Sequence, residues 1–384
     1  MPDSIVIVGG GLMGLSAAFH LQRTRATARV TVLERARIGA AASGASAAGV
    51  RVMGRDPAER GLALASLARW PELARELEAD TGYRRGGGLR VALDDAAWRQ
   101  AAPWVAEQRA DGVTLDLVDA ATARRLAPGI SPECRGGVYS AIDGQAEAMA
   151  TVRAFAAAAR RLGAQIGEGV GVAGLVSERD RIVAVTRTDG ARQPCDVVIV
   201  AAGVWSASLL APLSVRLPLE TRALQMLLTR PAPAALEPVI GAFGRRLSLK
   251  QLANGSYLIG GGWPADVPDQ PGNGWTLRDD SVDASLEVAR AVHPPTGRCA
   301  LERGWAGLEA FTPDDLPVLG PVPGVDNALV AAGFSGHGFA LSPVVGEVLA
   351  GLALGTEARP ELWSGLGAER FTLTTARRQE SAHA

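Results

Sequence analysis

The stretch SIVIVGGGLMG, residues 4–14, decides the fold. Four of its first five residues are apolar and β-branched, and glycines follow at once, which is typical of a buried parallel strand. Apolar residues then recur at helical spacing from Leu12 to Arg23, and a second short strand is indicated at residues 30–33. A strand, a helix and a strand within about 30 residues predict one βαβ unit.

Three glycines in this stretch match the spacing GxGxxG. Gly9 permits the tight turn out of the strand, Gly11 lets the backbone approach a pyrophosphate, and Gly14 lets the helix pack on the sheet. The helix N-terminus then presents free N–H groups to the phosphates. Glu34 follows 20 positions after Gly14, the spacing expected of a carboxylate that binds a ribose hydroxyl. The pattern predicts dinucleotide binding but does not separate FAD from NAD; the alternative is a glycine turn in an ordinary α/β protein.

Length and composition favour a globular protein of two domains. The chain has 384 residues, of which 47% are hydrophobic and 21% charged, and its formal net charge is −1. This balance gives no reason to expect nucleic acid or an anionic membrane as a partner. The cysteines and histidines show no metal-ligand spacing, so we expect no metal and a reducing, cytoplasmic compartment. We find no secretory signal and no apolar run of about 20 residues that could form a transmembrane segment.

Hydrophobic periodicity outlines the remaining elements. Helices are expected at residues 57–80 (broken at Pro71), 98–108, 120–126, 151–162 and 343–354, and strands at 89–93, 164–166, 172–176, 181–186, 196–201 and 328–332. Residues 212–299 are rich in proline and predict an antiparallel sheet with long loops.

Four further segments resemble the D-amino-acid oxidase/sarcosine oxidase (DAO) family of FAD-dependent amine oxidoreductases. They are ASGASAAG at 42–49, DVVIVAAGVWS at 196–206, WAGLEAFTPDDLPVLGP at 305–321 and GFSGHGFALSP at 333–343. These matches span nearly the whole chain in the family's order. The resemblance implies an α/β fold with two interwoven domains, a Rossmann-type FAD-binding domain and an antiparallel-sheet substrate domain. We assign residues 1–50, 140–211 and 320–370 to the FAD-binding domain, 51–139 and 212–319 to the substrate-binding domain, and 376–384 to a flexible tail.

The phosphate loop and the resemblance together imply the cofactor-binding residues. We expect FAD to contact Gly9, Gly11, Leu12, Met13, Gly14, Glu34, Arg35, Ser43, Ala45, Ser46, Val172, Ala202, Gly203, Trp205, Gly307, Gly333, Phe334, Ser335, Gly336, His337, Gly338 and Phe339. In the last segment, Ser342 as N-cap and Pro343 in the first turn favour the start of a helix. A helix start aimed at the flavin would stabilise the negative charge that develops on reduction.

Four side chains are candidates for the substrate site. Arg51 resembles a family arginine close to flavin and substrate, so we expect it to have a catalytic and substrate-binding role, and Arg55 could add to a clamp on a carboxylate. The alternative is two surface arginines. His337 in the flavin loop is a catalytic candidate or a structural histidine, and Tyr257 is expected either to face the substrate cavity or to lie in the core.

The chain departs from the monomeric sarcosine oxidase branch at three positions. Ala340 follows Phe339 where that branch has a lysine that holds the substrate carboxylate, and Leu258 stands where it has an oxygen-activating lysine. That branch also tethers its flavin through a cysteine near the position of Gly307, and no cysteine is found here. We therefore expect non-covalent FAD. Without a nearby cation, we expect a dehydrogenase that passes electrons to a partner.

The resemblance implies an enzyme that oxidises the C–N bond of an amino acid or N-substituted amino acid, of the sarcosine, opine, D-amino-acid or imino-acid type. Hydride would pass to the flavin N5 and leave an imine that hydrolyses. A second hypothesis is a catalytic or electron-relay beta-type subunit that is active only with partner chains. A third is an NAD-dependent dehydrogenase, against which the C-terminal flavin signature argues.

Overall fold

The first strand, β1 (Ser4–Val8), lies inside a six-stranded sheet whose order is β19-β20-β12-β1-β2-β8. The computed structural model describes residues 2–268, 274–356 and 359–371. The other strands of this sheet are β2 (Arg29–Glu34), β8 (Gln165–Glu168), β12 (Val197–Val200), β19 (Val318–Pro321) and β20 (Ala328–Ala332), and β1 pairs with β2 and β12. All pairs are parallel except β19 with β20. The predicted βαβ unit is therefore confirmed, and the start, middle and end of the chain meet in one sheet.

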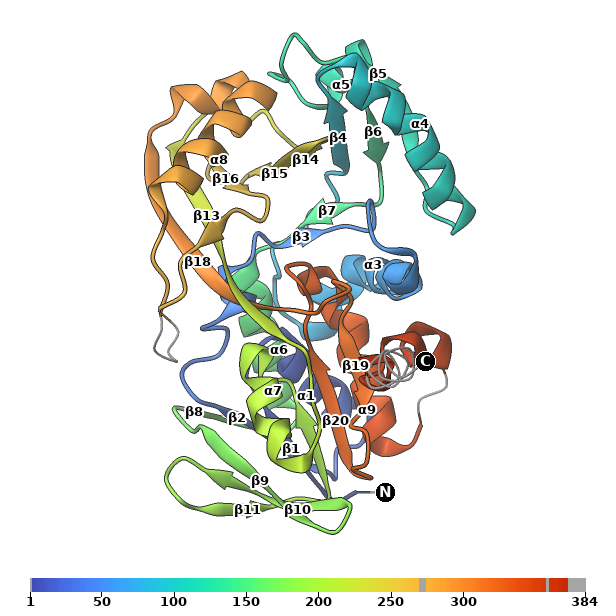
Figure 1. Cartoon of the computed structure of the whole chain (residues 1–384), viewed down its shortest axis with the longest axis vertical. Helices are drawn as coiled ribbons and strands as arrows, with labels where there is room; N and C mark the ends of the chain where they lie inside the picture. The colour runs from blue at the N-terminus through green and yellow to red at the C-terminus, as the bar shows by residue number, and fades with distance from the viewer. Residues whose placement is uncertain (1, 269–273, 357–358, 372–384) are drawn as a thin grey trace, which may run out of the picture.

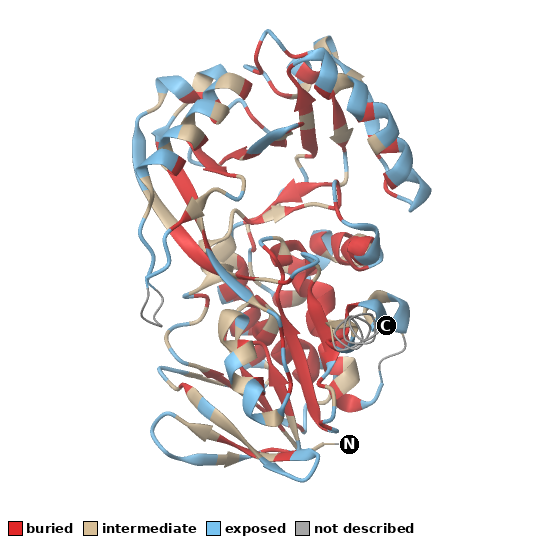
Figure 2. Cartoon of the chain, in the orientation of Figure 1, coloured by how far each residue is buried: buried red, intermediate tan, exposed pale blue. Residues whose placement is uncertain are grey.

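The two faces of β1 are both buried, which explains its continuous apolar run. Ile5 and Ile7 belong to the core that contains the helices α1 (Leu12–Thr24), α6 (Ala148–Arg161) and α9 (Ser342–Leu354). Val6 and Val8 face the opposite side and pack with β10 of a small three-stranded sheet. That sheet consists of β9 (Val172–Glu178), β10 (Arg181–Arg187) and β11 (Arg192–Pro194). Figure 2 shows the buried layer of strands and helices in the lower half of the molecule.

A nine-stranded sheet forms the upper half of the molecule (Figure 1). Its members are β4 (Gly88–Ala92), β5 (Asp116–Asp119), β6 (Gly136–Ser140), β13 (Glu220–Pro231), β14 (Val239–Ala242), β15 (Arg245–Gln251), β16 (Ser256–Gly260), β17 (Pro264–Ala265) and β18 (Leu301–Phe311). The helices α4 (Asp95–Ala110), α5 (Ala120–Leu126) and α8 (Asp279–Val292) also lie in this half. The long pair β13 and β18 runs from this half down to the six-stranded sheet. A ribbon of β3 (Gly49–Val50) and β7 (Gly144–Gln145) crosses between the halves.

The expected break at Pro71 is wrong, because α3 (Pro57–Leu77) continues through it. Asp56 caps the helix by accepting a hydrogen bond from the N–H of Ala58. The hydrogen bond that Pro71 cannot donate is offset by the apolar side chains of α3 that are buried around it, Trp70 among them. The helix packs on α6 and α9, although we had expected this segment to lie in the substrate-binding domain.

Helix α8 was missed within residues 212–299, where only strands and loops were expected. Its buried stripe is Ser281, Ser285, Ala289 and Val292, at the i, i+4 spacing of a helix face. Two of the four residues carry hydroxyls, so an apolar pattern does not reveal the face.

Ser342 is not the N-cap of α9. The chain enters the helix earlier, through a 3₁₀ turn at Gly338–Leu341. Ser342 is already helical and its hydroxyl donates to the carbonyl oxygen of Phe339. Pro343 lies in the first turn, as expected. The helix start therefore extends back to the glycine loop.

Two further expectations concern membrane-spanning segments and the C-terminal tail. No helix among residues 2–268, 274–356 and 359–371 is both long and apolar enough to cross a membrane. The expected tail at residues 376–384 lies outside the described residues. The domain boundaries stay a prediction.

The contact between helices α1 and α9 depends on a glycine, Gly346. A Cβ on Gly346 would lie 2.5 Å from the backbone carbon of Ser16 and 2.1 Å from its hydroxyl oxygen. We expect Gly346→Ala to destabilise the protein by roughly 1–3 kcal/mol, because a backbone cannot yield as a side chain can. This cost outweighs the gain of about 1 kcal/mol that alanine has over glycine within a helix.

Gly61→Ala in α3 is the matched control, because its Cβ would meet only Leu362, at 4.0 Å. Thermal unfolding of the two variants tests whether Gly346 is needed for the packing of α1 on α9. Gly61→Ala should melt at or above the wild-type temperature, and an equal result for Gly346→Ala would contradict the packing argument.

Candidate functional site

A cavity of about 630 Å³ opens at the carboxyl ends of β1, β2, β12 and β20. It is lined by Val8, Gly9, Gly11, Leu12, Met13, Leu33, Glu34, Arg35, Gly39, Ala40, Ala41, Ala42, Ser43, Ser46, Gly171, Val172, Ala173, Thr188, Ala201, Ala202, Gly203, Val204, Trp205, Ser208, Leu209, Leu308, Glu309, Ala310, Ala331, Gly333, Phe334, Gly336, Gly338 and Phe339. Strand ends at a change of direction in a parallel sheet are the usual place for a nucleotide.

The glycines of the phosphate loop leave space that side chains would fill. Gly9 has φ +114°, and a Cβ there would lie 2.3 Å from the carbonyl oxygen of Ala201. A Cβ on Gly14 would lie 2.1 Å from the carbonyl oxygen of Gly9. The hydroxyl of Ser43 accepts a hydrogen bond from the N–H of Leu12. The following N–H groups of the first helical turn have no intrahelical partner and remain for an anion.

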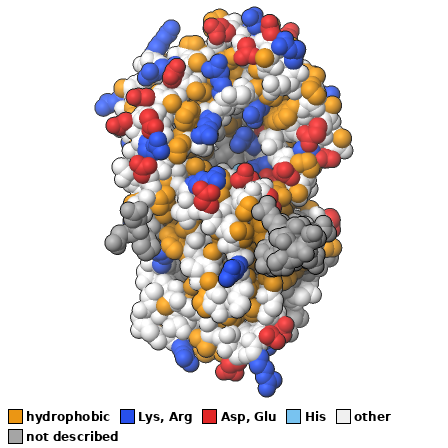
Figure 3. Space-filling view, in the orientation of Figure 1, with side chains coloured by type: hydrophobic (Ala, Val, Ile, Leu, Met, Phe, Trp, Pro, Cys, Tyr) orange, Lys and Arg blue, Asp and Glu red, His pale blue; other side chains and the backbone are white. Residues whose placement is uncertain are grey.

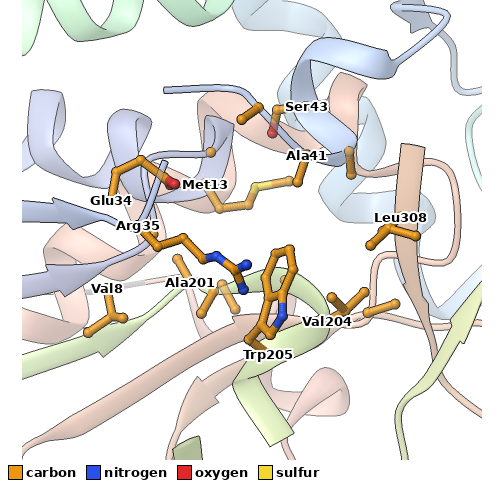
Figure 4. A pocket seen from close by; sticks show the side chains of 18 of the residues that line it. Val8, Met13, Glu34, Arg35, Ala41, Ser43, Ala201, Val204, Trp205 and Leu308 are labelled. Atoms are coloured by element: carbon orange, nitrogen blue, oxygen red, sulfur yellow. The ribbon is translucent and has the colours of Figure 1, made fainter. Parts of the chain in front are cut away.

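The acidic residue predicted for the ribose closes the second strand at the same cavity. The carboxylate of Glu34 accepts hydrogen bonds from the backbone N–H of Gly10 at 2.8 Å and of Ala36 at 2.7 Å. These bonds fix its orientation and leave lone pairs for hydroxyl donors. The guanidinium of Arg35 lies 4.3 Å from the ring centre of Trp205, and Figure 4 shows the pair together at one side of the cavity.

The loop after β20 forms the opposite wall. Gly333 and Ser335 both adopt positive φ, +67° and +49°, which turns the chain sharply at the strand end. The N–H of His337 donates to the carbonyl oxygen of Phe334, and Gly338 and Phe339 then reach the cavity. Trp70 stacks on Phe339 and its Nε1 donates to the carbonyl oxygen of Ala340. Through Trp70, helix α3 thus contacts the end of this loop at Phe339 and Ala340.

Most of the expected cofactor residues line the cavity. The exceptions are Gly14, Ala45, Gly307, Ser335 and His337. Gly14 packs against the phosphate loop itself, and Gly307 makes room for Ala45, whose Cβ would lie 2.7 Å from a Cβ at 307. The open helix start, the carboxylate at the strand end and the glycine cradle suit an extended dinucleotide such as FAD.

A model of the FAD-dependent oxidoreductase family DAO matches residues 4–352. The chain belongs to this family. It is therefore an FAD-dependent oxidoreductase, and members such as glycine oxidase oxidise amine donors. The family assignment confirms FAD as the cofactor, confirms the mixed α/β fold class and removes the NAD-dependent alternative.

Relatives match over nearly the whole chain. Glycine oxidase of Pseudomonas putida is 28% identical over 368 residues, which cover 93% of this chain and 96% of the relative. The hydrogen cyanide synthase subunit HcnC of Pseudomonas aeruginosa is 29% identical and covers 90% and 91%. The crystal structure of L-proline dehydrogenase from P. horikoshii has a TM-score of 0.89 at 25% identity, with coverage of 97% and 98%. Glycine oxidase from Bacillus cereus has a TM-score of 0.83 at 25% identity, with coverage of 94% and 97%.

Arg55 is a structural residue, which corrects its expected place in a substrate clamp. It is 8% exposed, and its Nη2 donates to the carbonyl oxygen of His337 at 2.9 Å. Its Nε donates to the carbonyl oxygen of Arg51, and its Nη1 lies 3.4 Å from the buried carboxylate of Glu59. All three nitrogens thus serve the protein itself, and they join the loop after β3 to the flavin loop.

Arg51 differs, because its guanidinium makes no hydrogen bond or ion pair with any residue in the described ranges. It is partly exposed and follows β3 directly. Its charge acts on its surroundings: it lowers the pKa of His337 and Arg90 and opposes the rise that burial causes in the pKa of Asp143. Figure 3 shows Lys and Arg side chains around a hollow between the two halves of the molecule.

His337 does not line the cavity with its side chain, which does not support the expected catalytic role. Burial, followed by the charges of Arg55 and Arg51, lowers the pKa of His337 to about 3. Its Nδ1 lies 3.4 Å from Glu59 without a hydrogen bond. The imidazole is therefore neutral at physiological pH and cannot act there as an imidazolium acid.

Tyr257 lies in the core, which settles its two alternatives. It is 2% exposed and makes an edge contact with the ring of His293, 5.4 Å between centroids. The prediction that it faces the substrate cavity is wrong, because its side chain leaves β16 on the face that packs on α8. Leu258, the next residue, points to the opposite face.

The sequence argument missed three charged residues. Glu309 lines the cavity at the end of β18. Arg90 on β4 lies over the rings of Trp104 and Phe243, and its buried Nε has no partner within the described ranges. Lys250 on β15 is 4% exposed and pairs in register with Leu258. It is the only lysine of the chain, among many arginines, and that signal was available in the sequence.

Arg55→Met should weaken FAD binding about tenfold or more, because the flavin loop loses its anchor at the carbonyl of His337. It should also lower stability by roughly 3–5 kcal/mol, since the buried charge of Glu59 is left without a partner. Flavin release on dilution and thermal unfolding measure the two effects.

The double variant Arg55→Met/Glu59→Met separates the effect on FAD affinity from the effect on stability, because it also removes the unpaired buried charge of Glu59. It should regain stability but not FAD affinity. Arg75→Met is the matched control, because that side chain is exposed on the same helix. Wild-type FAD affinity in the double variant would show that the anchor is unimportant.

Proposed function

We propose that the protein oxidises the C–N bond of an amino acid or N-substituted amino acid, of the sarcosine, opine, D-amino-acid or imino-acid type. Bound FAD would supply the hydride acceptor, and the product imine would hydrolyse. The observation that carries the proposal is the free guanidinium of Arg51 beside the flavin loop. A guanidinium with no partner in the protein is suited to a carboxylate on the substrate.

The surroundings of Arg51 favour an anion. Arg90 and Arg55 contribute positive charge within its reach, and Arg55 already has Glu59 as a partner. The acid on which Arg51 also acts, Asp143, is buried and accepts a hydrogen bond from the N–H of Val52. Arg90 carries no carboxylate partner within the described ranges. Two guanidiniums that repel each other are costly unless an anion joins them. A substrate carboxylate would supply that anion and orient its neighbouring carbon.

The names of the relatives agree with this substrate class. Glycine oxidase and L-proline dehydrogenase act by name on amino acids in which the amine lies next to a carboxylate. We infer from this likeness a primary or secondary amino acid as substrate.

A beta-type subunit that works only with partner chains is the alternative. The relative HcnC is by name one subunit of hydrogen cyanide synthase. The two functions are separated by adding candidate amino acids to the purified yellow protein without oxygen. Bleaching of the flavin band by one of them supports the enzyme acting alone. A protein that none of them bleaches, but that gains activity on co-expression with a neighbouring gene product, supports the subunit.

We also propose that FAD is bound without a covalent bond. The cavity lining contains no cysteine or histidine within the described ranges, and the neighbour of Gly307 is Ala45. Acid precipitation should therefore leave the yellow colour in solution.

Arg51→Met should raise the Kd for a simple carboxylate such as propionate by roughly 10- to 100-fold, the loss expected for hydrogen bonds between charged groups. The Kd of Arg51→Lys should lie between those of the wild type and of Arg51→Met, because lysine keeps the positive charge but not the planar guanidinium. Arg99→Met, an exposed change on α4, is the control. Ligand-induced changes in the flavin spectrum give the Kd, and an unchanged value for Arg51→Met would refute the carboxylate site.

The expected dehydrogenase activity rested on the lack of a cation near Leu258, and that premise is wrong. Lys250 lies across from Leu258 on the same face of the sheet. Its Nζ donates to the carbonyl oxygen of Ala146, whose N–H donates to Ala48. Ser46, which bonds the N–H of Ala48, lines the cavity. The one lysine is thus linked to the cavity wall by three hydrogen bonds.

Burial lowers the pKa of Lys250 to about 8, so the side chain is mostly charged at pH 7. A cation here would stabilise the negative charge that forms when oxygen is reduced. Lys250→Met should therefore slow reoxidation of the reduced protein by air about tenfold or more and leave bleaching by substrate unchanged. Stopped-flow measurement of both half-reactions tests this, with Lys250→Arg expected to retain most of the rate. Equal rates of reoxidation in the wild type, Lys250→Met and Lys250→Arg would favour a dehydrogenase.

A further inference from the structure

Glu309 occupies an unusual place for a carboxylate. It lies near the end of β18, next to Leu308 and Ala310, and all three line the cavity. The same region of the wall is formed by Phe334, Gly336, Gly338 and Phe339. Glu309 therefore borders the cavity beside the flavin loop, among residues that are mostly apolar or glycine.

The rest of the protein offers Glu309 little compensation. Its carboxylate accepts a hydrogen bond from the backbone N–H of Gly336. Its cross-strand neighbour is Arg222, but that guanidinium binds Glu220 at 2.6 and 2.9 Å and lies over the ring of Phe311. No ion pair of Glu309 occurs within the described ranges. The cavity thus holds a carboxylate without a counter-ion.

Glu34, the second acidic residue of the cavity lining, is a carboxylate whose hydrogen-bonding and charge requirements are better met. Glu34 accepts two backbone N–H bonds, and the neighbouring Arg35 is the single cationic side chain in the described lining. Glu309 has one such bond and no cation. Among the described residues that line the cavity, the ribose end thus has a cationic side chain and the flavin end has none.

Burial raises the pKa of Glu309 to about 7, and the N–H of Gly336 only partly opposes this rise. Near neutral pH the group is therefore poised between its two forms and can take up or release a proton at little cost. A cationic ligand placed against it would favour the carboxylate and lower the pKa again. Arg51 lies outside the cavity lining, but its charge acts on His337, the residue next to the Gly336 that Glu309 bonds.

We propose that Glu309 receives the protonated amine of the substrate and accepts a proton from it, while Arg51 holds the carboxylate. This inference rests on the proposed oxidation of an amino acid. In the proton step an N–H bond of the ammonium breaks and an O–H bond forms on Glu309, with no change of oxidation state. The neutral amine then has a free electron pair, which assists departure of hydride from the adjacent carbon to the bound FAD. Glu309 thus recognises the one group that distinguishes an amino acid from a simple carboxylic acid.

The test uses the FAD-loaded protein and two ligands, each of which carries half of an amino acid. Dimethylammonium has the amine alone, and propionate has the carboxylate alone. Both are titrated without oxygen, and binding is followed by the flavin spectrum and by calorimetry. Glu309→Gln keeps the size of the side chain, and Glu302→Gln, exposed on the same strand, is the matched control.

We expect wild-type protein to bind dimethylammonium about tenfold more tightly at pH 8 than at pH 6, because only the ionised carboxylate pairs with it. Glu309→Gln should lose at least that factor at pH 8 and show no pH dependence. Its affinity for propionate should be unchanged. Glu302→Gln should behave as wild type throughout.

Two results would overturn the proposal. One is an unchanged affinity and pH profile for dimethylammonium in Glu309→Gln. The other is release of FAD from Glu309→Gln with no effect on dimethylammonium, which would assign the carboxylate to the flavin. Failure of the proposed function is a different result, because then no amino acid bleaches the wild-type flavin even though dimethylammonium binding depends on Glu309.

Discussion

The buried guanidinium of Arg55 joins two loops that are 282 residues apart in the chain, and the site depends on that junction. By bonding the carbonyl of His337 it fixes the loop that closes the cavity. Because it is buried it requires Glu59, and the charges of Arg55 and Arg51 help keep His337 neutral. Arg51 is left with a free guanidinium. One structural ion pair therefore leaves Arg51 as the cation that we propose for the substrate carboxylate.

Local signals sufficed for the nucleotide half and failed where the site depends on packing. The glycines at 9 and 14 and the acid at 34 have a fixed spacing, because Gly14 packs on Gly9 and Glu34 accepts a hydrogen bond from the N–H of Gly10. The family resemblance, the cofactor and the fold class are confirmed. The individual site residues and the domain boundaries stay predictions, apart from those that the structure corrects.

The corrections share a physical cause. Tyr257 and Leu258 are neighbours in sequence, yet one enters the core and the other the opposite face, and only the sheet pairing decides which. Arg51 and Arg55 are alike in sequence, but the carbonyl that occupies Arg55 comes from the far end of the chain. Glu309 lies within a segment that we matched to the family, and the role proposed for it rests on its having no ion-pair partner within the described ranges. Such information resides in contacts between distant segments.

The order in which the sheet is assembled has a consequence for how the protein is made. The phosphate loop ends at Gly14, but its sheet gains β12 only after residue 200 and β20 only after residue 332, and the closing loop reaches Gly338. At about 5–20 residues per second, a ribosome needs roughly 15 to 65 s to pass from Gly14 to Gly338. For that time the N-terminal half of the cofactor site exists without its other wall. We therefore expect FAD to load late in biosynthesis, once both ends of the chain have contributed their walls of the cavity.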